Sequence, residues 1–220
     1  MFGEIAETYD LMNCLMSFGQ DQVWRRCVAR MAAPPQGGVL LDTGTGTGRI
    51  GHEVLKNHPT VTVVASDFSL EMMRVGQCAG SSRRMLWCAG DAVGLPFKDN
   101  SFDAVTSGYL IRNVRDAFLA FSEQVRVVRP GGRVVCLDTS PPPNTPLQPV
   151  LLFFLNHMIP LLGQIISRNR FAYTYLPEST KMFFSPDQLA RTMRRAGLVN
   201  IAYRRYMLGA IAVHVGTKPN

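Results

Sequence analysis

The chain lacks the features of a membrane-spanning, secreted or zinc-binding protein. It contains no uninterrupted run of about 18 apolar residues, so we expect no membrane-spanning helix. Residues 1–10 mix acidic side chains with a glycine and lack an apolar segment, so we expect no signal peptide. The five cysteines form no CxxC pair and the four histidines show no ligand spacing, so we expect neither a metal site nor a disulfide framework. These absences favour a protein of the reducing cytoplasm.

Acidic residues are scarce near the C-terminus. The formal net charge is +7, and residues 167–220 carry nine Lys and Arg against two acids, so the rest of the chain is neutral. A basic end attracts nucleic acid or an anionic membrane surface, although it can equally be a solvated face. No nucleic-acid-binding motif accompanies this charge, so we expect no nucleic-acid partner.

The length of 220 residues and the hydrophobic content of 46% suffice for one sizeable core. Internal repeats and low-complexity segments are absent from the sequence. We therefore expect one domain over residues 1–220. It would comprise N-terminal helices (1–36), a central core (37–140), an inserted segment (141–185) and a C-terminal helix with two strands (186–220).

Short apolar runs alternate with amphipathic stretches along most of the chain. The expected strands cover residues 39–41, 61–66, 85–88, 102–106, 134–137, 201–203 and 211–215. The expected helices cover residues 2–18, 23–31, 115–128 and 186–196, and a further one opens at Ser69 as its cap. We expect the helix over 115–128 to end at Pro130-Gly131-Gly132. This alternation predicts an α/β fold with a doubly wound, mostly parallel sheet.

A glycine-rich loop follows the first of these strands. Val39-Leu40-Leu41-Asp42-Thr43 leads into Gly44-Thr45-Gly46-Thr47-Gly48, and an amphipathic helix begins directly after it. Glycine is used where a backbone must turn sharply or approach a ligand closely, because it has no Cβ. A strand, a glycine turn and a helix amino terminus form a nucleotide site in open α/β sheets. The alternative is a plain tight turn with Asp42 as a helix cap.

Asp42 discriminates between two nucleotide cofactors. Residues 46–51 match the GxGxxG pattern of dinucleotide-binding proteins, but a carboxylate at the strand's end would repel the pyrophosphate of NAD. S-adenosylmethionine (SAM) has no phosphate and presents an ammonium and a sulfonium, which an acidic site attracts. Asp67 ends the next apolar run, with Phe68 beside it, and can accept hydrogen bonds from the ribose of either cofactor. We therefore expect SAM.

Residues 150–162 form an apolar segment after a proline-rich stretch. The segment, Val150–Leu162, is apolar nearly all round but too short and interrupted to cross a bilayer. A core helix is one interpretation. Because the parallel sheet already has its helices, we expect instead that the segment covers a pocket or contacts lipid.

Further motifs are spread over almost the whole chain. They are Tyr9-Asp10-Leu11-Met12-Asn13, Leu15-Met16-Ser17-Phe18-Gly19 with Trp24, Asp91-Ala92 with Leu95-Pro96-Phe97, Arg112-Asn113-Val114, Pro130-Gly131-Gly132, Tyr173-Thr174-Tyr175-Leu176-Pro177-Glu178-Ser179 and Ala196-Gly197. Together with the glycine loop they resemble the ubiquinone/menaquinone biosynthesis C-methyltransferases, which are class I SAM enzymes. The glycine loop and the Pro-Gly-Gly turn are shared with many SAM methyltransferases, whereas YDxMN, RNV and YLPES are more specific to quinone methylation.

The resemblance implies a class I methyltransferase fold, SAM as the cofactor and a prenylated quinol, a precursor of menaquinol or ubiquinol, as the substrate. The residues expected to bind the cofactor are Asp42, Gly44, Thr45, Gly46, Gly48, Asp67, Phe68, Asp91 and Ala92. A ring carbon is a poor nucleophile until a neighbouring hydroxyl, with a pKa near 10, loses its proton. The resemblance points to Arg112 as the group that favours the phenolate, with Tyr9 and Asn113 orienting the ring.

The residues themselves leave alternatives open for this site. Asn113 with Asp116 also fits a capping box, and Tyr9 fits a core aromatic. The chain departs from the family pattern at Arg49, where an acid is usual, at Leu110, where a glycine is usual, and at Cys14, where an Asp is usual. Methylation of a small phenol or lipid amine, or a non-catalytic SAM-binding role in a quinone-biosynthesis assembly, therefore stays open.

A prenylated quinol lies in the bilayer, so its enzyme must reach the membrane. Val150–Leu162 would dip into the interface while Arg168, Arg170, Arg191, Arg194 and Arg195 face anionic head groups. In the counter-interpretation, the segment only roofs a pocket. We expect a cytoplasmic protein that binds the inner face of the membrane peripherally, with a homodimer left open.

Overall fold

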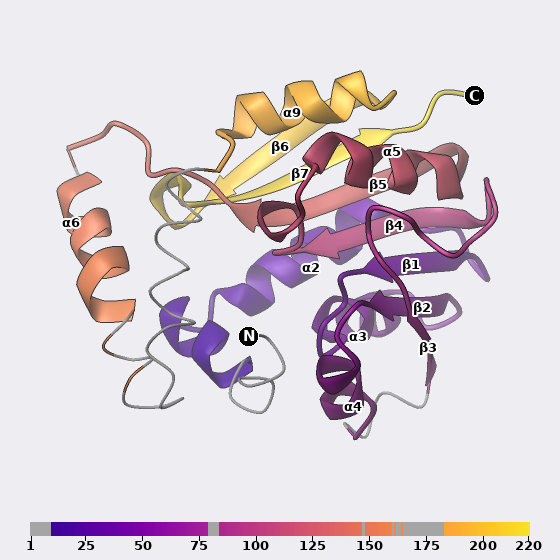
Figure 1. Ribbon diagram of the computed structural model, residues 1–220, viewed down its shortest axis with the longest axis horizontal. Helices are drawn as coiled ribbons and strands as arrows, with labels where there is room; N and C mark the ends of the chain where they lie inside the picture. Colours follow the sequence, from indigo (N-terminus) through magenta and orange to yellow (C-terminus); the bar gives the residue numbers. More distant parts are fainter. Residues whose placement is uncertain (1–9, 79–83, 147, 160, 162–163, 165–182) are drawn as a thin grey trace.

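Seven strands form one sheet in the part of the chain that the computed structural model describes, namely residues 10–78, 84–146, 148–159, 161, 164 and 183–220. Their order is β3-β2-β1-β4-β5-β7-β6, with helices on both faces (Figure 1). Neighbours among β1 to β5 run parallel, whereas β7 pairs antiparallel with β5 and β6. The predicted doubly wound, mostly parallel sheet is confirmed. The strands are β1 (Val39–Thr43), β2 (Thr62–Asp67), β3 (Met85–Ala89), β4 (Phe102–Gly108), β5 (Val128–Thr139), β6 (Val199–Tyr206) and β7 (Ile211–Thr217).

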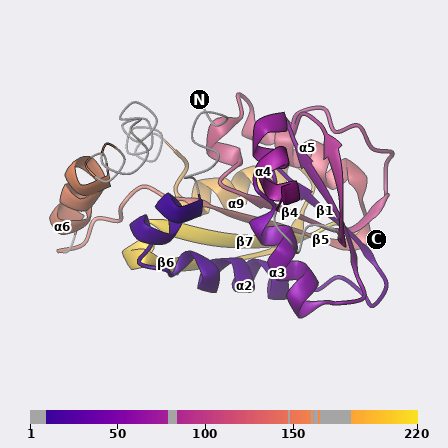
Figure 2. The same ribbon diagram turned by 90° about the horizontal axis from the view of Figure 1, so that it is seen from below.

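Two pairs of helices cover the two faces of this sheet (Figure 2). Trp24, Val28 and Val54 of α2 and α3 are buried in the core on one face, and Phe121 and Met193 of α5 and α9 on the other. Each buried set recurs at helical spacing, which is why these amphipathic stretches fold as surface helices. The helical elements are α2 (Asp21–Ala32), α3 (Arg49–Asn57), α4 (Leu70–Cys78), η2 (Ile111–Asn113), α5 (Ala117–Val127), α6 (Gln148–Phe153), η3 (Phe154–Met158), α9 (Pro186–Arg195) and η4 (Met207–Gly209).

Side-chain caps fix where two of these helices begin. The Met72 amide donates to Ser69 Oγ at 3.3 Å, which confirms Ser69 as the cap of α4. At α9 a reciprocal capping box joins Ser185 and Gln188, with Pro186 at the first helical position.

The start of β5 differs from the prediction. The strand begins at Val128, directly after α5, and therefore contains the Pro-Gly-Gly sequence that we expected to precede it. Phe102 pairs with Val128 but Ala104 with Arg133, so the intervening residues form a bulge. Pairing continues through this bulge because the Gly131 amide donates to the carbonyl of Lys218 at 2.9 Å.

The apolar segment lies at one end of the molecule (Figure 1). Its described part forms the short helix α6 and then the π-helix η3, with Leu151 and Leu155 buried and Phe153 58% exposed. Phe154 of this segment contacts Phe18, in the turn after the helical residues 10–16, with 5.5 Å between the ring centroids. The helix predicted over 2–18 ends at residue 16, because residues 17 and 18 form a turn, and its residues 2–9 lie outside the described part of the chain. Among those that are described, no helix is both long and apolar enough to cross a membrane.

The order in which the chain adds strands to the sheet reverses between β1 and β4. From β1 the parallel strands continue to β2 and β3 on one side and to β4 and β5 on the other. The loops that leave the carboxyl ends of β1 and β4 therefore diverge and leave a crevice between them. Open α/β sheets bind ligands at this point.

Candidate active site

The glycine loop turns from β1 into α3 through three left-handed residues. Gly44, Gly46 and Gly48 have φ angles of 63°, 57° and 78°, a region that other residues adopt only with strain. The loop is also packed closely. A Cβ on Gly48 would lie 2.8 Å from Trp87, and one on Gly44 would lie 2.6 Å from Leu110. The sequence therefore needs glycine here both for its backbone angles and for space.

Asp42 lies beneath this loop and is 1% exposed. Its carboxylate accepts hydrogen bonds from Thr45 Oγ1 at 2.6 Å, Thr106 Oγ1 at 2.8 Å and the Gly51 amide at 3.3 Å. Burial raises the pKa of Asp42 to about 6, although these three donors act in the opposite direction. The carboxylate thus occupies the amino end of α3, where a dinucleotide would need its pyrophosphate.

Asp67 holds the other side of the loop from the end of β2. The Gly46 amide donates to Asp67 Oδ2 at 2.7 Å, and the Ser69 amide donates to Oδ1 at 2.8 Å. Burial raises the pKa of Asp67, while the hydrogen bonds from Ser69 and Gly46 lower it. Two carboxylates therefore meet the glycine loop, which disfavours a phosphate and favours a cationic ligand such as SAM.

A cavity of ≈ 610 Å³ opens beside Asp67. Its volume is typical of a small-molecule site. Its walls include Phe68, Asp91 and Ala92, which we expected from the sequence to bind the cofactor. Phe68 is 81% exposed and offers a free aromatic face, as an adenine ring would require. The cavity extends to Leu110, Asn113, Val114 and Arg115 beyond the end of β4.

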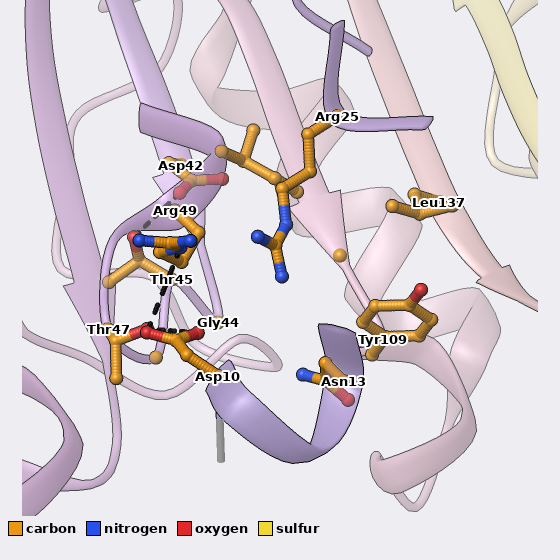
Figure 3. Close-up of a pocket in the computed structure, with 13 residues that line it drawn as sticks. Asp10, Asn13, Arg25, Asp42, Gly44, Thr45, Thr47, Arg49, Tyr109 and Leu137 are labelled. Atoms are coloured by element: carbon orange, nitrogen blue, oxygen red, sulfur yellow. Dashed lines mark hydrogen bonds and ion pairs between the residues drawn. The ribbon is translucent and has the colours of Figure 1, made fainter. Parts of the chain in front are cut away.

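A second cavity, of ≈ 40 Å³, adjoins the glycine loop on the side of α2 (Figure 3). Its walls include Asp42 and Thr45 of the loop region and Asp10 and Asn13 of the N-terminal helix. Arg25 of α2 also lines it, and Figure 3 shows its guanidinium pointing into the space between the loop and Tyr109. Arg25 is a site residue that sequence reasoning missed.

Arg49, at the first position of α3, points to the same region from the loop side. Its Nε lies 3.8 Å from Asp10 Oδ2, and Asp10 also accepts a hydrogen bond from Thr47 Oγ1 at 3.0 Å. An acid at this position would repel Asp10. Arg49, which stands where the family pattern usually has an acid, therefore attracts Asp10 and links the N-terminal helix to the loop.

Arg112 is buried beside the site rather than in either cavity. Its side chain is 8% exposed, its Nη1 lies 3.7 Å from Asp138 Oδ1, and its guanidinium carbon lies 5.1 Å from the ring centre of Tyr109. The Arg112 amide donates to Asp138 Oδ2 at 3.2 Å. Nε and Nη1 of Arg112 are buried without a hydrogen-bond acceptor among the described residues. Tyr109 itself has a left-handed φ of 56°, an unusual angle for an aromatic residue.

Asn113 does not cap a helix. Its Nδ2 donates to the carbonyl of Tyr109 at 2.7 Å, whereas Asp116 caps α5 by accepting from the Leu119 amide at 3.0 Å. The capping-box alternative for Asn113 is therefore wrong, because the helix begins three residues later than that motif needs. Asn113 instead closes the turn after β4 and lines the large cavity. Tyr9, the third expected catalytic residue, lies outside the described residues.

Residues 1–218 match the model of the ubiE/COQ5 methyltransferase family. The chain belongs to this family. It is 45% identical over 218 residues to the ubiquinone/menaquinone biosynthesis C-methyltransferase UbiE of Desulfotalea psychrophila, covering 99% of this chain and 89% of that protein. It is 38% identical to the demethylmenaquinone methyltransferase of Thermus thermophilus, with both chains covered in full. The chain is accordingly a SAM-dependent C-methyltransferase of quinone biosynthesis.

Solved structures agree with this assignment at the level of the fold. A SAM-dependent methyltransferase from Thermotoga maritima, described as a possible histamine N-methyltransferase, gives a TM-score of 0.68 at 22% identity and covers 99% of this chain and 97% of its own. Phosphoethanolamine N-methyltransferase 2 of Haemonchus contortus in complex with S-adenosyl-L-methionine gives 0.67 at 16% identity, covering 90% of this chain and 52% of its own. The predicted class I methyltransferase fold is confirmed.

Proposed function

We propose that this member of the ubiE/COQ5 family transfers the methyl group of SAM to a ring carbon of a demethylmenaquinol, a prenylated quinol. The observation that best supports this proposal is the ≈ 610 Å³ cavity, whose walls include both Asp67 and Phe68 and, farther on, Asn113 and Val114. It thus extends from the expected nucleoside site to the segment that the family resemblance assigns to the acceptor ring. The relatives from Roseiflexus castenholzii, at 44% identity, and Thermus thermophilus, at 38%, are both named demethylmenaquinone methyltransferases.

The residues of the loop would hold SAM by its charges and its ribose. When bound, SAM supplies an electrophilic methyl group on a cationic sulfur. Asp67 accepts the ribose hydroxyls, Phe68 covers the adenine, and Asp91 and Ala92 line the same cavity. Asp42 lies beneath Gly44 and Thr45 and, with Gly46 and Gly48, shapes the loop, so its negative charge stabilises the ammonium and sulfonium.

Arg112 acts on the acceptor in this proposal. A guanidinium keeps its proton at neutral pH, so its contribution is electrostatic: it favours the phenolate form of the quinol, and the hydroxyl proton passes to water. The buried carboxylate of Asp138 and the ring of Tyr109 hold the guanidinium in place from two sides. Nε and Nη1 have no hydrogen-bond acceptor among the described residues, so they would be donors for an oxyanion. Asn113 and Tyr9 would orient the ring.

We also propose that the apolar end of the molecule contacts the membrane that holds the quinol. Phe153, Met158 and Leu161 near α6 and η3 are 58%, 38% and 50% exposed, and Phe18 is 72% exposed. The ring contact between Phe18 and Phe154 places these groups side by side. The inserted segment 141–185, part of which lies outside the described residues, would act as the lid of the acceptor site. Arg191, Arg194 and Arg195 of α9 would add attraction to anionic lipid, although α9 leads away from α6 (Figure 1). Arg168 and Arg170, the other two arginines expected to face head groups, lie outside the described residues.

Turnover of methyl-labelled SAM with a panel of acceptors tests the substrate. The panel contains a demethylmenaquinol, a ubiquinol precursor, a small phenol and a lipid amine, and mass spectrometry locates the new methyl group. We expect methylation of a ring carbon of the demethylmenaquinol. Transfer only to the phenol or the amine would assign a different acceptor. SAM binding without transfer to any of the four would indicate a non-catalytic subunit.

A further inference from the structure

The small cavity beside the glycine loop has the dimensions of a single polar group. It measures ≈ 40 Å³, and one water-sized group needs about 10–15 Å³, so it has room for about three heavy atoms. A carboxylate has three heavy atoms, whereas a quinol ring is several times larger. The cavity therefore suits the end of a ligand whose body lies elsewhere.

The large cavity is the place for that body, because the small cavity adjoins it. The two share Gly44, Gly46, Gly108 and Tyr109 in their walls. The ribose site at Asp67 belongs to the large cavity alone. SAM is a linear molecule whose ribose lies between the adenine and the amino-acid arm. With the adenine toward Phe68, the arm is left to follow the shared loop into the small cavity.

Arg25 is the buried cation of this cavity. Its side chain is 8% exposed, and its Nη1 lies 2.9 Å from Asp21 Oδ2 one helical turn earlier. Asp21 is fixed in turn by Ser17, whose Oγ donates to Asp21 Oδ1 at 3.2 Å. The pairing holds one side of the guanidinium against α2, and the other side projects into the cavity (Figure 3).

We propose that Arg25 binds the carboxylate of the methionine arm of SAM. A planar guanidinium matches a carboxylate through two parallel hydrogen bonds, and its low exposure spares the pair from solvent screening. Asp10 and Asp42, on the facing wall, leave the opposite charge for the ammonium and sulfonium. Arg49 is the competing cation, but its side chain is 48% exposed and already faces Asp10. The inference rests on SAM as the cofactor and not on the identity of the acceptor.

Calorimetry with two probes isolates the carboxylate. The probes are S-adenosylhomocysteine and its decarboxylated analogue, which differ only in that group. We expect the unmodified enzyme to prefer S-adenosylhomocysteine by about ten- to a hundredfold, the range of a hydrogen-bonded charge pair. Arg25→Met should abolish this preference and leave the affinity for the analogue unchanged. Arg26→Met is the matched control, because Arg26 is its neighbour on α2 and pairs instead with Glu53 at 3.4 Å.

A second variant guards against misfolding, since Arg25→Met leaves Asp21 buried without its cation. The double variant Asp21→Asn, Arg25→Met removes both charges and should show the same loss of preference. Retention of the preference in either variant would overturn the inference. An equal loss of affinity for both probes would also overturn it, because that result indicates a purely structural role. So would loss of the preference in Arg49→Ala together with its retention in Arg25→Met. No acceptor enters the assay, so a wrong quinol assignment leaves the result unaffected.

Discussion

At the scale of single residues, Asp42 connects the fold of the glycine loop to the proposed cofactor site. It receives three hydrogen bonds from the loop, from β4 and from the amino end of α3, so its position is fixed before a ligand arrives. Burial nevertheless raises the pKa of this carboxyl to about 6, and no cation in the described part of the chain offsets the lost hydration. A bound sulfonium and ammonium would supply that charge.

The affinity for SAM should therefore depend on pH around this pKa. Below pH 6 the carboxyl of the free enzyme is protonated, and binding a cation must first remove the proton. As the pH rises through 6, this cost disappears and the affinity increases to a plateau. Because each pH unit below the pKa costs up to about tenfold in affinity, we expect the dissociation constant to be about tenfold larger at pH 5 than at pH 7. Isothermal titration calorimetry in matched buffers measures it.

Two controls separate Asp42 from Asp67, whose pKa burial also raises. The uncharged nucleoside 5′-methylthioadenosine uses the ribose site at Asp67 but brings no cation to Asp42, so its affinity should lack the Asp42 step. Asp42→Asn should remove the difference between the two ligands. An unchanged pH dependence for SAM in this variant would assign the titration to another group.

Arg112 offers a prediction about chemistry at the same scale. Arg112→Ala should lower turnover with the quinol by at least about 100-fold, a typical contribution of one electrostatic group, and leave the affinity for SAM little changed. Asp138→Asn should lower turnover by a smaller factor, because it removes the charge that holds the guanidinium without removing the guanidinium itself.

Arg30→Ala is the control for these variants, since Arg30 is an exposed residue of α2. Stopped-time assays with labelled SAM give turnover, and calorimetry gives the SAM affinity. Near-normal turnover of Arg112→Ala with every accepted quinol would transfer the role to another residue.

At the scale of elements, the glycine loop is constrained twice, by backbone angle and by packing. Gly48 and Gly37 both have left-handed φ angles, 78° and 72°, but only Gly48 has side chains where a Cβ would stand. Gly37→Ala should cost about 1–2 kcal/mol of unfolding free energy, the strain of that conformation alone. Gly48→Ala should cost about 1–3 kcal/mol more, because Trp87 and Met85 must move. Urea unfolding measures both.

The two glycine variants also separate stability from function. Gly48→Ala should lower the affinity for S-adenosylhomocysteine, since the loop can relieve the contact with Trp87 only by shifting. Gly37→Ala, in the turn before β1, should leave that affinity unchanged. Equal destabilisation by the two substitutions would show that packing beneath the loop is looser than the structure indicates.

Elements with strong local signals were predictable from the sequence. The apolar runs gave the strands of the parallel sheet, and Ser69 gave the start of α4, because burial on both faces and a side-chain cap act within a few residues. The extent of β5 was not predictable. Its Pro-Gly-Gly sequence signals a turn, yet pairing with Lys218, far away in the chain, keeps it in the sheet as a bulge.

The candidate site was predictable where one element carries the signal, and not where two elements meet. The glycine loop and Asp67 each follow a strand, so their location at the carboxyl edge follows from topology. Arg25 carries no such signal, because a basic residue in an amphipathic helix is normally solvated. Only the packing of α2 against the loop turns it inward. The pair Arg112 and Asp138 likewise forms from η2 and the end of β5, 26 residues apart.

At the scale of the whole molecule, the two cavities and the apolar end have separate locations. The cavities lie at the carboxyl edge of the sheet, whereas α6 and η3 lie at one end beside the N-terminal helix (Figure 1). A hydrophobic acceptor would thus approach along an apolar surface, while SAM would enter by a polar one. Under the function proposed above, this arrangement would let the enzyme methylate a membrane-held ring while its cofactor stays in water.

Vesicle sedimentation tests this arrangement. We expect the protein to bind vesicles with anionic lipid, more weakly at high salt, because each basic side chain close to the surface contributes about 1 kcal/mol. Changing Phe153 and Phe154 to Ser should reduce binding by removing apolar contact area. Leu86→Ser is the matched control, since Leu86 is 61% exposed on the edge strand β3, away from α6 (Figure 1). Equal binding to neutral and anionic vesicles would contradict the electrostatic attachment, and binding to neither would leave the segment as a pocket lid alone.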